Sequence, residues 1–330
     1  MNFTNAIKAA IVATTLAMTA SVAAAQNLTS VTLASSSSSL PAGGLRLANE
    51  LGLFKKHGLD AKITPMDSGA VATLALLSNS VEFSNSGPND VVINNAKGQD
   101  VVLVMSTYHG NPGVLVLSKK KVQELGISPS APLKDKLKAL DGLSIATPSA
   151  TSTYTVAGRS AETVGARVKF VYMAQPAMVA ALETGAIDGY IASSPFWTAP
   201  VLRNEAVVWV SGPAGEWPEA YSPVNAVTVH TTGKYAAKNP QIVKAVRDVG
   251  KDLAAAFKER PQEVKAAISR LFPDLNEDTI DLIIKIETPA FSSTRPVTAE
   301  DMAKEIAFAR LSGVELPPDD KLKPASMIAP

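Results

Sequence analysis

Hydrophobic and polar positions along the 330-residue chain follow two different spacings. Short runs rich in apolar residues, at 31–34 and 100–108 among others, predict buried strands. Between these runs, apolar residues recur every three or four positions, as in 41–58 and 70–80, which predicts amphipathic helices. Because strands and helices alternate, we expect an α/β fold with parallel sheets and helices on both faces.

The pattern begins a second time near Leu143. In addition, ALLSNSVEFSNSGP at residues 75–88 resembles ALETGAIDGYIASSP at residues 181–195. This internal similarity predicts two Rossmann-like lobes rather than one large sheet, with chance similarity in an Ala- and Ser-rich chain as the alternative explanation. The aligned pairs are Ala75 with Ala181, Asn79 with Gly185, Val81 with Ile187, and Glu82 with Asp188.

The chain is expected to cross between the two lobes. A Gly-, Pro- and Trp-rich passage at 211–223 is typical of such a crossing, and a predicted strand at 223–230 follows it. We expect lobe 1 to comprise residues 26–111 and 224–330, and lobe 2 to comprise residues 112–223. Helical patterns dominate the chain beyond the strand, and we expect this C-terminal extension to pack on lobe 1.

The first 25 residues have the features of a signal peptide. Lys8 precedes an apolar stretch rich in Ala and Thr, and Ala23, Ala24 and Ala25 form a small-residue cleavage site before Gln26. The stretch is short for a membrane span, so a membrane anchor is the weaker alternative. We therefore expect a secreted protein that is free in the periplasm.

Charge and cysteine content exclude several classes of function. Removing Lys8 with the signal peptide leaves 31 − 1 = 30 basic residues against 30 acidic ones, so the mature chain is formally neutral. A neutral chain without a basic block does not favour binding to nucleic acid. The absence of cysteine excludes disulfides, thiolate catalysis and cysteine-ligated metal.

Ligands of open parallel sheets bind beyond the carboxyl ends of the strands. Seven loops are expected there, and hydroxyl and amide side chains dominate them. They contain no Lys or Arg, and Asp67 is their one carboxylate. These loops are residues 35–40, 67–69, 85–89 and 108–111 in lobe 1, and residues 147–154, 173–176 and 193–197 in lobe 2.

This composition limits the chemistry of the ligand. A polyanion normally requires Arg or Lys, whereas backbone N–H groups, hydroxyls and helix N-termini can hold one sulfonate, carboxylate or nitrate. The alternative for any single loop is that its Ser and Thr residues only cap helices and form turns. Aromatic residues near these loops are expected either to line the cleft or to pack between the lobes; they are Tyr108, Tyr154, Phe196, Trp197, Trp217 and Tyr221.

Catalytic patterns are missing from the sequence. Of its histidines, His57, His109 and His230, only His109 lies in an expected cleft loop. There is no Gly-x-Ser-x-Gly motif and no cluster with the spacing of metal ligands. We expect no enzyme, no cofactor and no metal; a hydrolase using His109 or Asp67 is the alternative from another class.

Four segments resemble a known family. They are LANELGLFKKHGLDAKI, LALLSNSVEFSNSGPNDVVINNAKGQDVVLV, LKALDGLSIATPSATSTYTVAGRSAE and PAMVAALETGAIDGYIASSPFWTAPVL. With them the chain, from about Val31 to at least Val229, resembles the periplasmic substrate-binding proteins of ABC importers for nitrate, sulfonates and taurine. The family also includes binders of thiamine-precursor pyrimidines.

The resemblance implies a Venus-flytrap fold, a monomer, a small ligand between the lobes and a membrane permease as partner. It favours a sulfonate or carboxylate over nitrate, because nitrate binders tend to carry basic residues that these loops lack. A planar uncharged ligand such as a pyrimidine is the alternative. Together with the loop analysis it predicts these ligand contacts: Ser37, Ser38, Ser39, Leu40, Asp67, Ser86, Gly87, Tyr108, His109, Ser149, Thr151, Ser152, Thr153, Tyr154, Gln175, Ser194 and Phe196.

Overall fold

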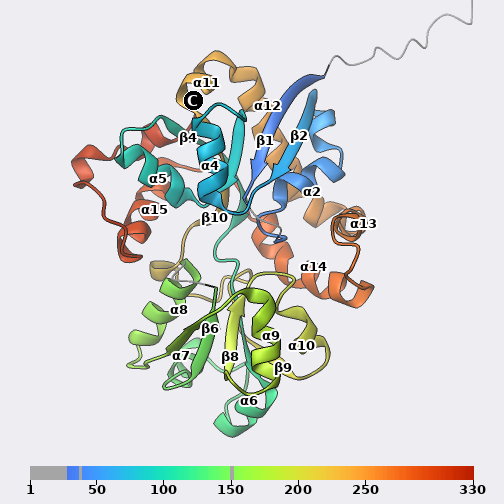
Figure 1. Cartoon of the computed structure of the whole chain (residues 1–330), viewed down its shortest axis with the longest axis vertical. Coiled ribbons are helices and arrows are strands. Elements are labelled where there is room, and N and C mark those ends of the chain that lie inside the picture. The colour runs from blue at the N-terminus through green and yellow to red at the C-terminus, as the bar shows by residue number, and fades with distance from the viewer. Residues whose placement is uncertain (1–27, 37–38, 149–151) are drawn as a thin grey trace, which may run out of the picture.

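The structure is a computed structural model that describes residues 28–36, 39–148 and 152–330. Two five-stranded sheets lie one above the other along the long axis (Figure 1). The upper sheet, with its helices, is called lobe 1, and has the order β2-β1-β3-β10-β4. Its strands are β1 (Thr29–Ser35), β2 (Leu59–Pro65), β3 (Phe83–Ser86), β4 (Val101–His109) and β10 (Asn225–Thr232).

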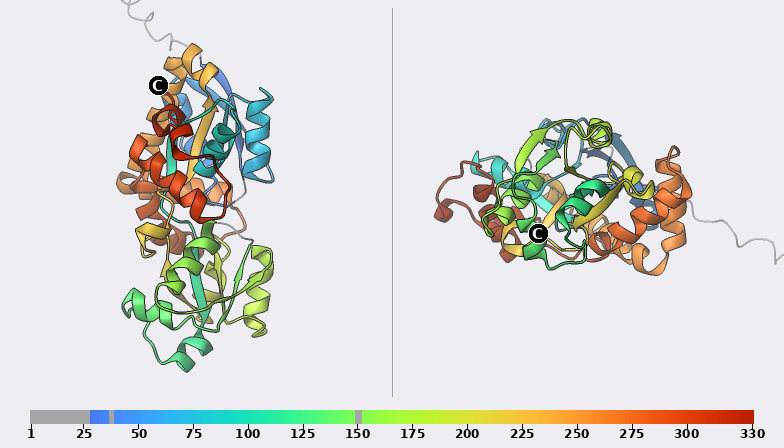
Figure 2. Two further views of the ribbon diagram at one scale, coloured as in Figure 1. Left: turned by 90° about the vertical axis from the view of Figure 1, so that its left-hand side faces the viewer. Right: turned by 90° about the horizontal axis from the view of Figure 1, so that it is seen from below.

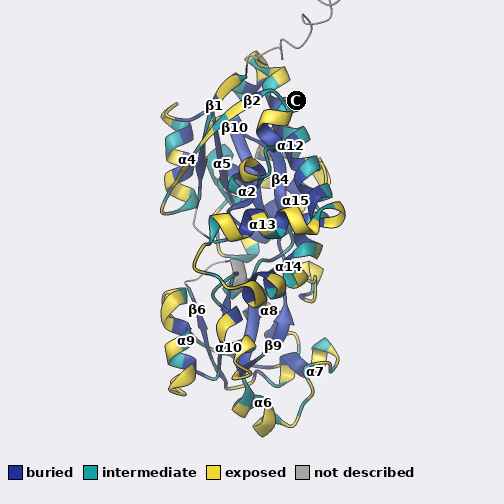
Figure 3. Ribbon diagram, turned by 90° about the vertical axis from the view of Figure 1, so that its right-hand side faces the viewer, coloured by how far each residue is buried: buried dark blue, intermediate teal, exposed yellow. Residues whose placement is uncertain are grey.

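The lower sheet, called lobe 2 with its helices, has the order β7-β6-β8-β5-β9. Its strands are β5 (Val114–Ser118), β6 (Ser144–Thr147), β7 (Lys169–Tyr172), β8 (Gly189–Ala192) and β9 (Ala206–Ser211). The strands are mostly buried, while the outer faces of the helices are exposed (Figure 3). The two-lobed α/β fold predicted from the sequence is confirmed.

Both sheets are mixed rather than purely parallel, which corrects the expectation from the sequence. β10 runs antiparallel to β3 and β4, and β5 runs antiparallel to β8 and β9. These two strands are the ones that enter a lobe directly from the other lobe. Because the chain arrives at the edge where the parallel strands end, the arriving strand must run in the opposite direction.

The two crossings between the lobes, residues 110–113 and 212–224, are joined by backbone hydrogen bonds. Gly110 N donates to Val224 O at 2.8 Å, and Gly212 N donates to Gly113 O at 3.0 Å. A Cβ at Gly212 would lie 2.6 Å from Gly113 O and nearer still to Asn111 O. Glycine is therefore required at position 212 for the close approach of the two crossings.

Helices cover both faces of each sheet. In lobe 1, apolar side chains of α2, α12, α13 and α14 pack on one face and those of α4, α5 and α15 on the other. The helices are α2 (Gly44–Glu50), α3 (Leu53–Lys56), α4 (Gly69–Leu77), α5 (Pro88–Ala96), α6 (Lys119–Leu125), α7 (Leu133–Lys138), α8 (Ser152–Glu162), α9 (Gln175–Glu183), α10 (Thr198–Leu202), α11 (Gly233–Lys238), α12 (Pro240–Glu259), α13 (Pro261–Leu271), α14 (Glu277–Ser292) and α15 (Ala299–Leu311). Short 3-10 helices complete the fold: η1 (Glu219–Tyr221), η2 (Asp319–Lys321) and η3 (Pro324–Met327).

One predicted helix is broken. The sequence suggested a single helix over residues 41–58, but α2 ends before Gly52 and α3 begins after it. Gly52 has a φ of 70°, a left-handed conformation that cannot continue an α-helix.

The internal repeat is confirmed in detail. Helix α4 with β3 and helix α9 with β8 occupy equivalent stretches, and the aligned Asn79 and Gly185 both have positive φ. Glu82 accepts a hydrogen bond from Thr32 N of β1 at 2.7 Å. Asp188 likewise accepts from Ser144 N of β6 at 2.9 Å. Each acid thus joins the turn that precedes its own strand to the neighbouring strand by a hydrogen bond. The similarity of the two sequence segments therefore reflects a structural repeat.

The C-terminal helices pack on lobe 1 as predicted, and they also reach lobe 2. Helix α12 lies on β4, α13 on α2 and α15 on α5, while α14 contacts α10 of lobe 2. Leu282 and Ile286 of α14, and Phe308 of α15, join apolar clusters of lobe 2. These helices run along the side of lobe 1 down to the junction (Figure 2). In the described part of the chain, no helix is long and apolar enough to cross a membrane.

Replacing Gly212 by alanine is expected to lower the free energy of unfolding by about 1–3 kcal/mol, because the new Cβ would push the two crossings apart. Urea unfolding measures this. Gly158→Ala in α8 is the matched control, since its Cβ would make only an ordinary contact with Phe170 at 3.5 Å. Equal stability of the two variants would contradict the packing argument.

Candidate functional site

The carboxyl ends of β1 and β3 in lobe 1 face those of β6 and β8 in lobe 2. This follows from strand direction, because β4 ends and β5 begins at the first crossing. Strands β1 and β3 run in the same direction as β4 and therefore end at this edge of lobe 1. Strands β6 and β8 run opposite to β5 and therefore end at the facing edge of lobe 2. The two edges meet where Leu40 N donates to Ser194 O at 3.2 Å. The predicted loops therefore share one junction between the lobes.

Asn85 organises the loop that follows β1, and it was not among the predicted site residues. It is fully buried, accepts from Ser36 N at 2.7 Å and donates from Nδ2 to Ala42 O at 2.7 Å. Its position at the end of β3, where the predicted loop 85–89 begins, was the available signal, because an amide there can bind backbone groups on both sides of a neighbouring loop.

Four predicted contact residues are fully buried and bind groups of the protein itself: Leu40, Ser86, Tyr108 and Ser194. Ser86 Oγ lies 3.4 Å from Nδ1 of the buried His230, whose pKa burial lowers to about 3. Neutral His230 also pairs with Thr228 at 2.6 Å. These side chains fix the shape of the junction.

Glu287 of α14 links the two lobes through a buried network. Tyr108 Oη at the end of β4 and Ser194 Oγ after β8 each donate to one of its carboxylate oxygens. Trp197 Nε1 donates to Ser194 Oγ at 3.0 Å. Burial raises the pKa of Glu287 to about 7, against the two hydroxyl hydrogen bonds that favour its charged form.

Glu305 of α15 fastens the second crossing. Its Oε1 accepts from Asn225 N at 2.8 Å, and burial raises its pKa to about 8. Neither glutamate was predicted from the sequence, because both come from the C-terminal helices rather than from loops at strand ends. Their positions inside the apolar faces of amphipathic helices were the available signal.

Seven predicted residues remain at least partly exposed. Asp67 is exposed, and Ser39, Gly87, His109, Tyr154, Gln175 and Phe196 are half-buried. Ser37, Ser38, Ser149 and Thr151 lie outside the described residues. Ser152 and Thr153 open α8, but their side chains also lie outside what the structure describes.

Lobe 2 holds its site loops by internal contacts. Gln175 Oε1 accepts from Ser193 N at 2.9 Å and from Ser193 Oγ at 3.2 Å. The ring of Tyr154 meets the edge of Phe170 with centroids 4.6 Å apart. Tyr190 Oη donates to Phe196 O at 3.0 Å. The loops at 173–175 and 193–196 are thus braced against each other.

Lobe 1 has a carboxylate at the junction that lies outside the seven predicted loops. Asp90, in the first turn of α5, bonds with Ser86, and burial raises its pKa. A Cβ at Gly69 would lie 3.0 Å from Asp90 Oδ2, so this carboxylate occupies the start of α4. The lobe 1 side of the junction therefore disfavours an anion.

A cavity of about 990 Å³ lies beside the crossings, and we call it the crossing cavity. It is formed by both crossings, η1 and α15, and helix α8 contacts η1 next to it. Of the predicted contact residues, His109 lines it. Its other side chains include aromatic, polar and charged groups: Asn111, Trp217, Glu219, Tyr221, Ser222, Arg295, Asp301 and Lys304.

Arg295 and Lys304 show where the expectation of an uncharged cleft fails. Both belong to the C-terminal extension, which was expected to pack on lobe 1 and which supplied none of the seven predicted loops. Each is paired with an acid of the same cavity, so the charges that line it balance: Arg295 binds Asp301, and Lys304 lies near Glu219.

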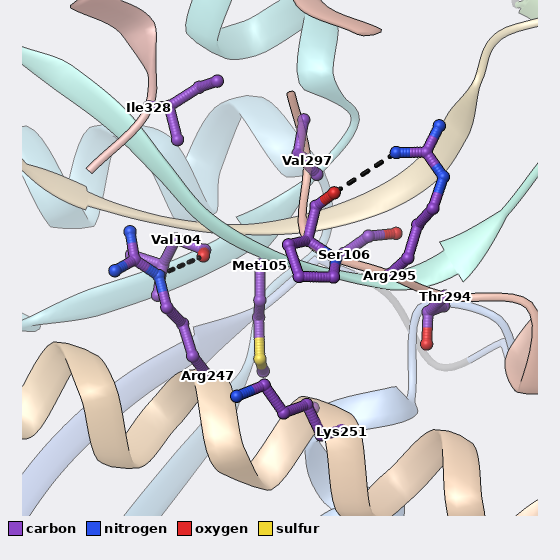
Figure 4. A pocket seen from close by; sticks show the side chains of 11 residues that line it. Val104, Met105, Ser106, Arg247, Lys251, Thr294, Arg295, Val297 and Ile328 are labelled. Atoms are coloured by element: carbon purple, nitrogen blue, oxygen red, sulfur yellow. Dashed lines mark hydrogen bonds between the residues drawn. The ribbon is translucent and has the colours of Figure 1, made fainter. Parts of the chain in front are cut away.

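A smaller cavity of about 360 Å³ lies within lobe 1, between α12, β4 and residues 294–297 (Figure 4). Val104, Met105, Val297 and Ile328 form an apolar floor between basic side chains. Arg247 Nε donates a hydrogen bond to Val104 O at 3.1 Å. All the described residues that line this cavity belong to lobe 1, so it does not belong to the junction.

The described residues contain no group of three or more His, Asp or Glu side chains placed to hold a metal ion. Burial and the charge of Arg295 lower the pKa of His109, while Asp301 of α15 and Glu219 of η1 act in the opposite direction. Polar and aromatic side chains line the crossing cavity, so it can bind and orient a polar molecule.

Residues 42–264 match the family model described as NMT1/THI5 like. The chain belongs to the NMT1/THI5-like family. A search of curated protein sequences finds no match to this family member.

Solved structures share the fold of this NMT1/THI5-like chain. The periplasmic aliphatic sulphonate-binding protein SsuA from Escherichia coli has a TM-score of 0.66 and 18% identity, over 91% of this chain and 96% of that one. The periplasmic sulfonate-binding protein SsuA from Methylobacillus flagellatus KT has a TM-score of 0.64 and 19% identity, over 90% and 91%. The periplasmic nitrate-binding protein NrtA from Synechocystis PCC 6803 has a TM-score of 0.55 and 12% identity, over 89% and 84%. The predicted resemblance to such binding proteins is confirmed.

The buried Glu287 predicts a pH dependence of stability. Its pKa is about 7 in the folded state against 4.5 unfolded, so its contribution is fully present below pH 4.5 and is lost as the pH rises through 7. The loss is on the order of 3 kcal/mol. We expect Glu287→Gln, which stays neutral, to show a smaller decrease in unfolding free energy between pH 5 and pH 8.

Urea unfolding at several pH values measures this difference. Glu263→Gln, which changes an exposed carboxylate of α13, is the control and should follow the unmodified protein. If Glu287→Gln and Glu263→Gln lose stability alike with rising pH, Glu287 is not the responsible group.

Proposed function

We propose that this chain is the solute-binding component of an ABC importer, and that it captures a small organic anion between its two lobes. The observation that carries the proposal is the junction itself, where strand ends of both lobes face each other beside a 990 Å³ cavity. A solute that contacts both lobes stabilises the closed arrangement by its differential affinity for it.

The proposed role also implies where the protein works and which partner it has. The mature protein begins after a cleaved segment at residues 1–25, works in the periplasm as a monomer and delivers its solute to a membrane permease. Lobe 1 comprises residues 26–111 and 224–330, and lobe 2 comprises residues 112–223. The sulfonate- and nitrate-binding proteins of the same fold support this role.

The anionic group of the solute binds at the start of α8 in lobe 2. Other helix starts at the junction are less suitable, since Asp90 lies beside the starts of α4 and α5. Pro176 removes an N–H from the first turn of α9. Helix α8 has no acid in its first turn, so the N–H groups of that turn and the helix dipole favour an anion there.

A planar uncharged solute is the second candidate. Trp217 and Tyr221 line the crossing cavity, whose charged groups balance one another. Flat aromatic walls without net charge suit a neutral ring. In that case, neutral heterocycles would bind and simple organic anions would not.

Replacing Ser149, Thr151 and Thr153 together by alanine is expected to weaken the binding of organic anions at least tenfold, while the free energy of unfolding stays within about 0.5 kcal/mol. Calorimetry with alkanesulfonates and carboxylates, alongside alcohols of the same length, measures the affinity. The anions should bind and the alcohols should not.

Ser118→Ala is the matched control, because Ser118 caps α6 of lobe 2, accepting from Lys121 N at 3.2 Å. It should lower stability by roughly 0.5–2 kcal/mol and leave binding unchanged. An equal loss of stability in the triple variant would indicate that its hydroxyls only cap α8. A panel in which no small solute binds would overturn the proposed function.

A further inference from the structure

Helix α14 is a part of the C-terminal extension that packs against lobe 2. It contacts α10, and its Leu282 and Ile286 join an apolar cluster of lobe 2 that includes Trp197. The attraction between apolar side chains has no preferred direction, so this contact alone would allow α14 to slide over lobe 2. Hydrogen bonds are directional and can fix one placement of the two lobes.

Glu287 supplies such hydrogen bonds from the same helix. It is fully buried, and one of its carboxylate oxygens accepts from Tyr108 Oη at the end of β4 in lobe 1. The other oxygen accepts from Ser194 Oγ, in the loop after β8 of lobe 2. Trp197 Nε1 donates to the same Oγ at 3.0 Å, so the hydroxyl hydrogen of Ser194 is left for the carboxylate. A single side chain thus holds one hydroxyl from each lobe.

Ser194 is bound to lobe 1 a second time, through its backbone. Its carbonyl oxygen accepts from Leu40 N, in the loop after β1, at 3.2 Å. Both residues are buried. The loop after β8 is therefore joined to lobe 1 by a side chain and by the main chain, close to the first crossing, which begins two residues after Tyr108.

Separating the lobes at this contact would be costly. Among the described residues no cation acts on Glu287: burial raises its pKa, and the hydroxyls of Ser194 and Tyr108 lower it. Withdrawal of Ser194 would leave a buried carboxylate oxygen without its donor, and would expose the apolar cluster that Leu282 and Ile286 join. The contact should therefore persist while the lobes move elsewhere.

Helices α4 and α9 lie on one side of the molecule, and α14 lies nearer the other side (Figure 3). They are the helices that the internal repeat makes equivalent, one in each lobe, and both begin at the facing edges of the sheets. A rotation of the lobes about the α14 contact would therefore change the separation of α4 and α9.

We propose that Glu287 is a positioning residue: by holding Tyr108 and Ser194 together, it fixes the contact about which the two lobes turn, so that they open on the side of α4 and α9. Glu287 itself does not touch the solute. The affinity for the solute depends on Glu287 because only correctly placed lobes can contact the solute from both sides. The inference rests on the proposed function, since a fixed contact serves binding only if the lobes close on a solute.

Spin labels on Leu74→Cys of α4 and Ala180→Cys of α9, both exposed positions, report the distance between the lobes by pulsed electron–electron double resonance. In the solute-free protein, Glu287→Ala should widen the distance distribution about twofold, because the directional bonds are lost. Glu287→Gln should keep the width of the unmodified protein, since its amide can accept from one hydroxyl and donate to the other.

Ile283→Ala is the matched control, because Ile283 is a buried residue of the same helix that packs in the core of lobe 1. It should lower the midpoint of thermal unfolding and leave the width of the distribution unchanged. If Glu287→Ala does not fold, as judged by thermal unfolding, Ser194→Ala removes the hydroxyl of lobe 2 alone and should widen the distribution instead.

Butane-1-sulfonate is the solute probe, and calorimetry measures its affinity. Glu287→Ala should weaken its binding at least about threefold, whereas Glu287→Gln and Ile283→Ala should stay within about twofold of the unmodified protein, because only the first variant frees the lobes to take other placements.

The outcomes distinguish the two proposals. If Glu287→Ala keeps the native width, or if Glu287→Gln widens the distribution as much as Glu287→Ala, the positioning role is wrong whether or not a solute binds. Equal affinities of these two variants for butane-1-sulfonate would also contradict the positioning role, and the binding function would stand. If Glu287→Ala alone widens the distribution but no anion binds the unmodified protein, the fixed contact stands and the proposed function fails.

Discussion

The polarity of the two crossings determines where this protein can hold a ligand. Gly110 with Val224 and Gly212 with Gly113 bind the crossings side by side, so the chain enters each lobe at the edge that faces the other lobe. Strands that arrive there run antiparallel to their neighbours, and the parallel strands must then end at the same edge. The facing loops, the crossing cavity and any motion between the lobes all follow from this arrangement.

The C-terminal helices stabilise the junction from outside. Glu287 of α14 connects the end of β4 to the loop after β8, and Glu305 of α15 holds the end of the second crossing. A buried carboxylate is costly unless it is hydrogen-bonded or protonated, and the raised pKa of each glutamate reflects that cost. The extension therefore does more than cover lobe 1, because it contributes to the connection between the lobes and to one wall of the cavity.

Much of the fold could be predicted from the sequence, because periodicity and the repeat are local signals. Glu82 binds Thr32 and Asp188 binds Ser144, so the two acids that the weak repeat aligns make the same kind of hydrogen bond in their two lobes. Strand direction could not be predicted, since β10 looks like any buried strand until its point of entry is known. The site was predicted only in part: His109 lines the cavity, whereas Tyr108 and Ser194 bind Glu287, 93 or more residues away in sequence. Partners so distant leave no local pattern, and the same holds for Arg295 and Lys304.

The central claim is that a solute bound at the junction brings the lobes to a closed arrangement. Because the natural chain has no cysteine, spin labels can be attached to cysteines introduced at exposed sites of α4 and α9, one in each lobe. Pulsed electron–electron double resonance then measures the distance between lobes with and without an organic anion that binds by calorimetry. We predict that the solute shifts the distances to a shorter, narrower distribution. A distribution that stays the same when the solute is bound would contradict the account.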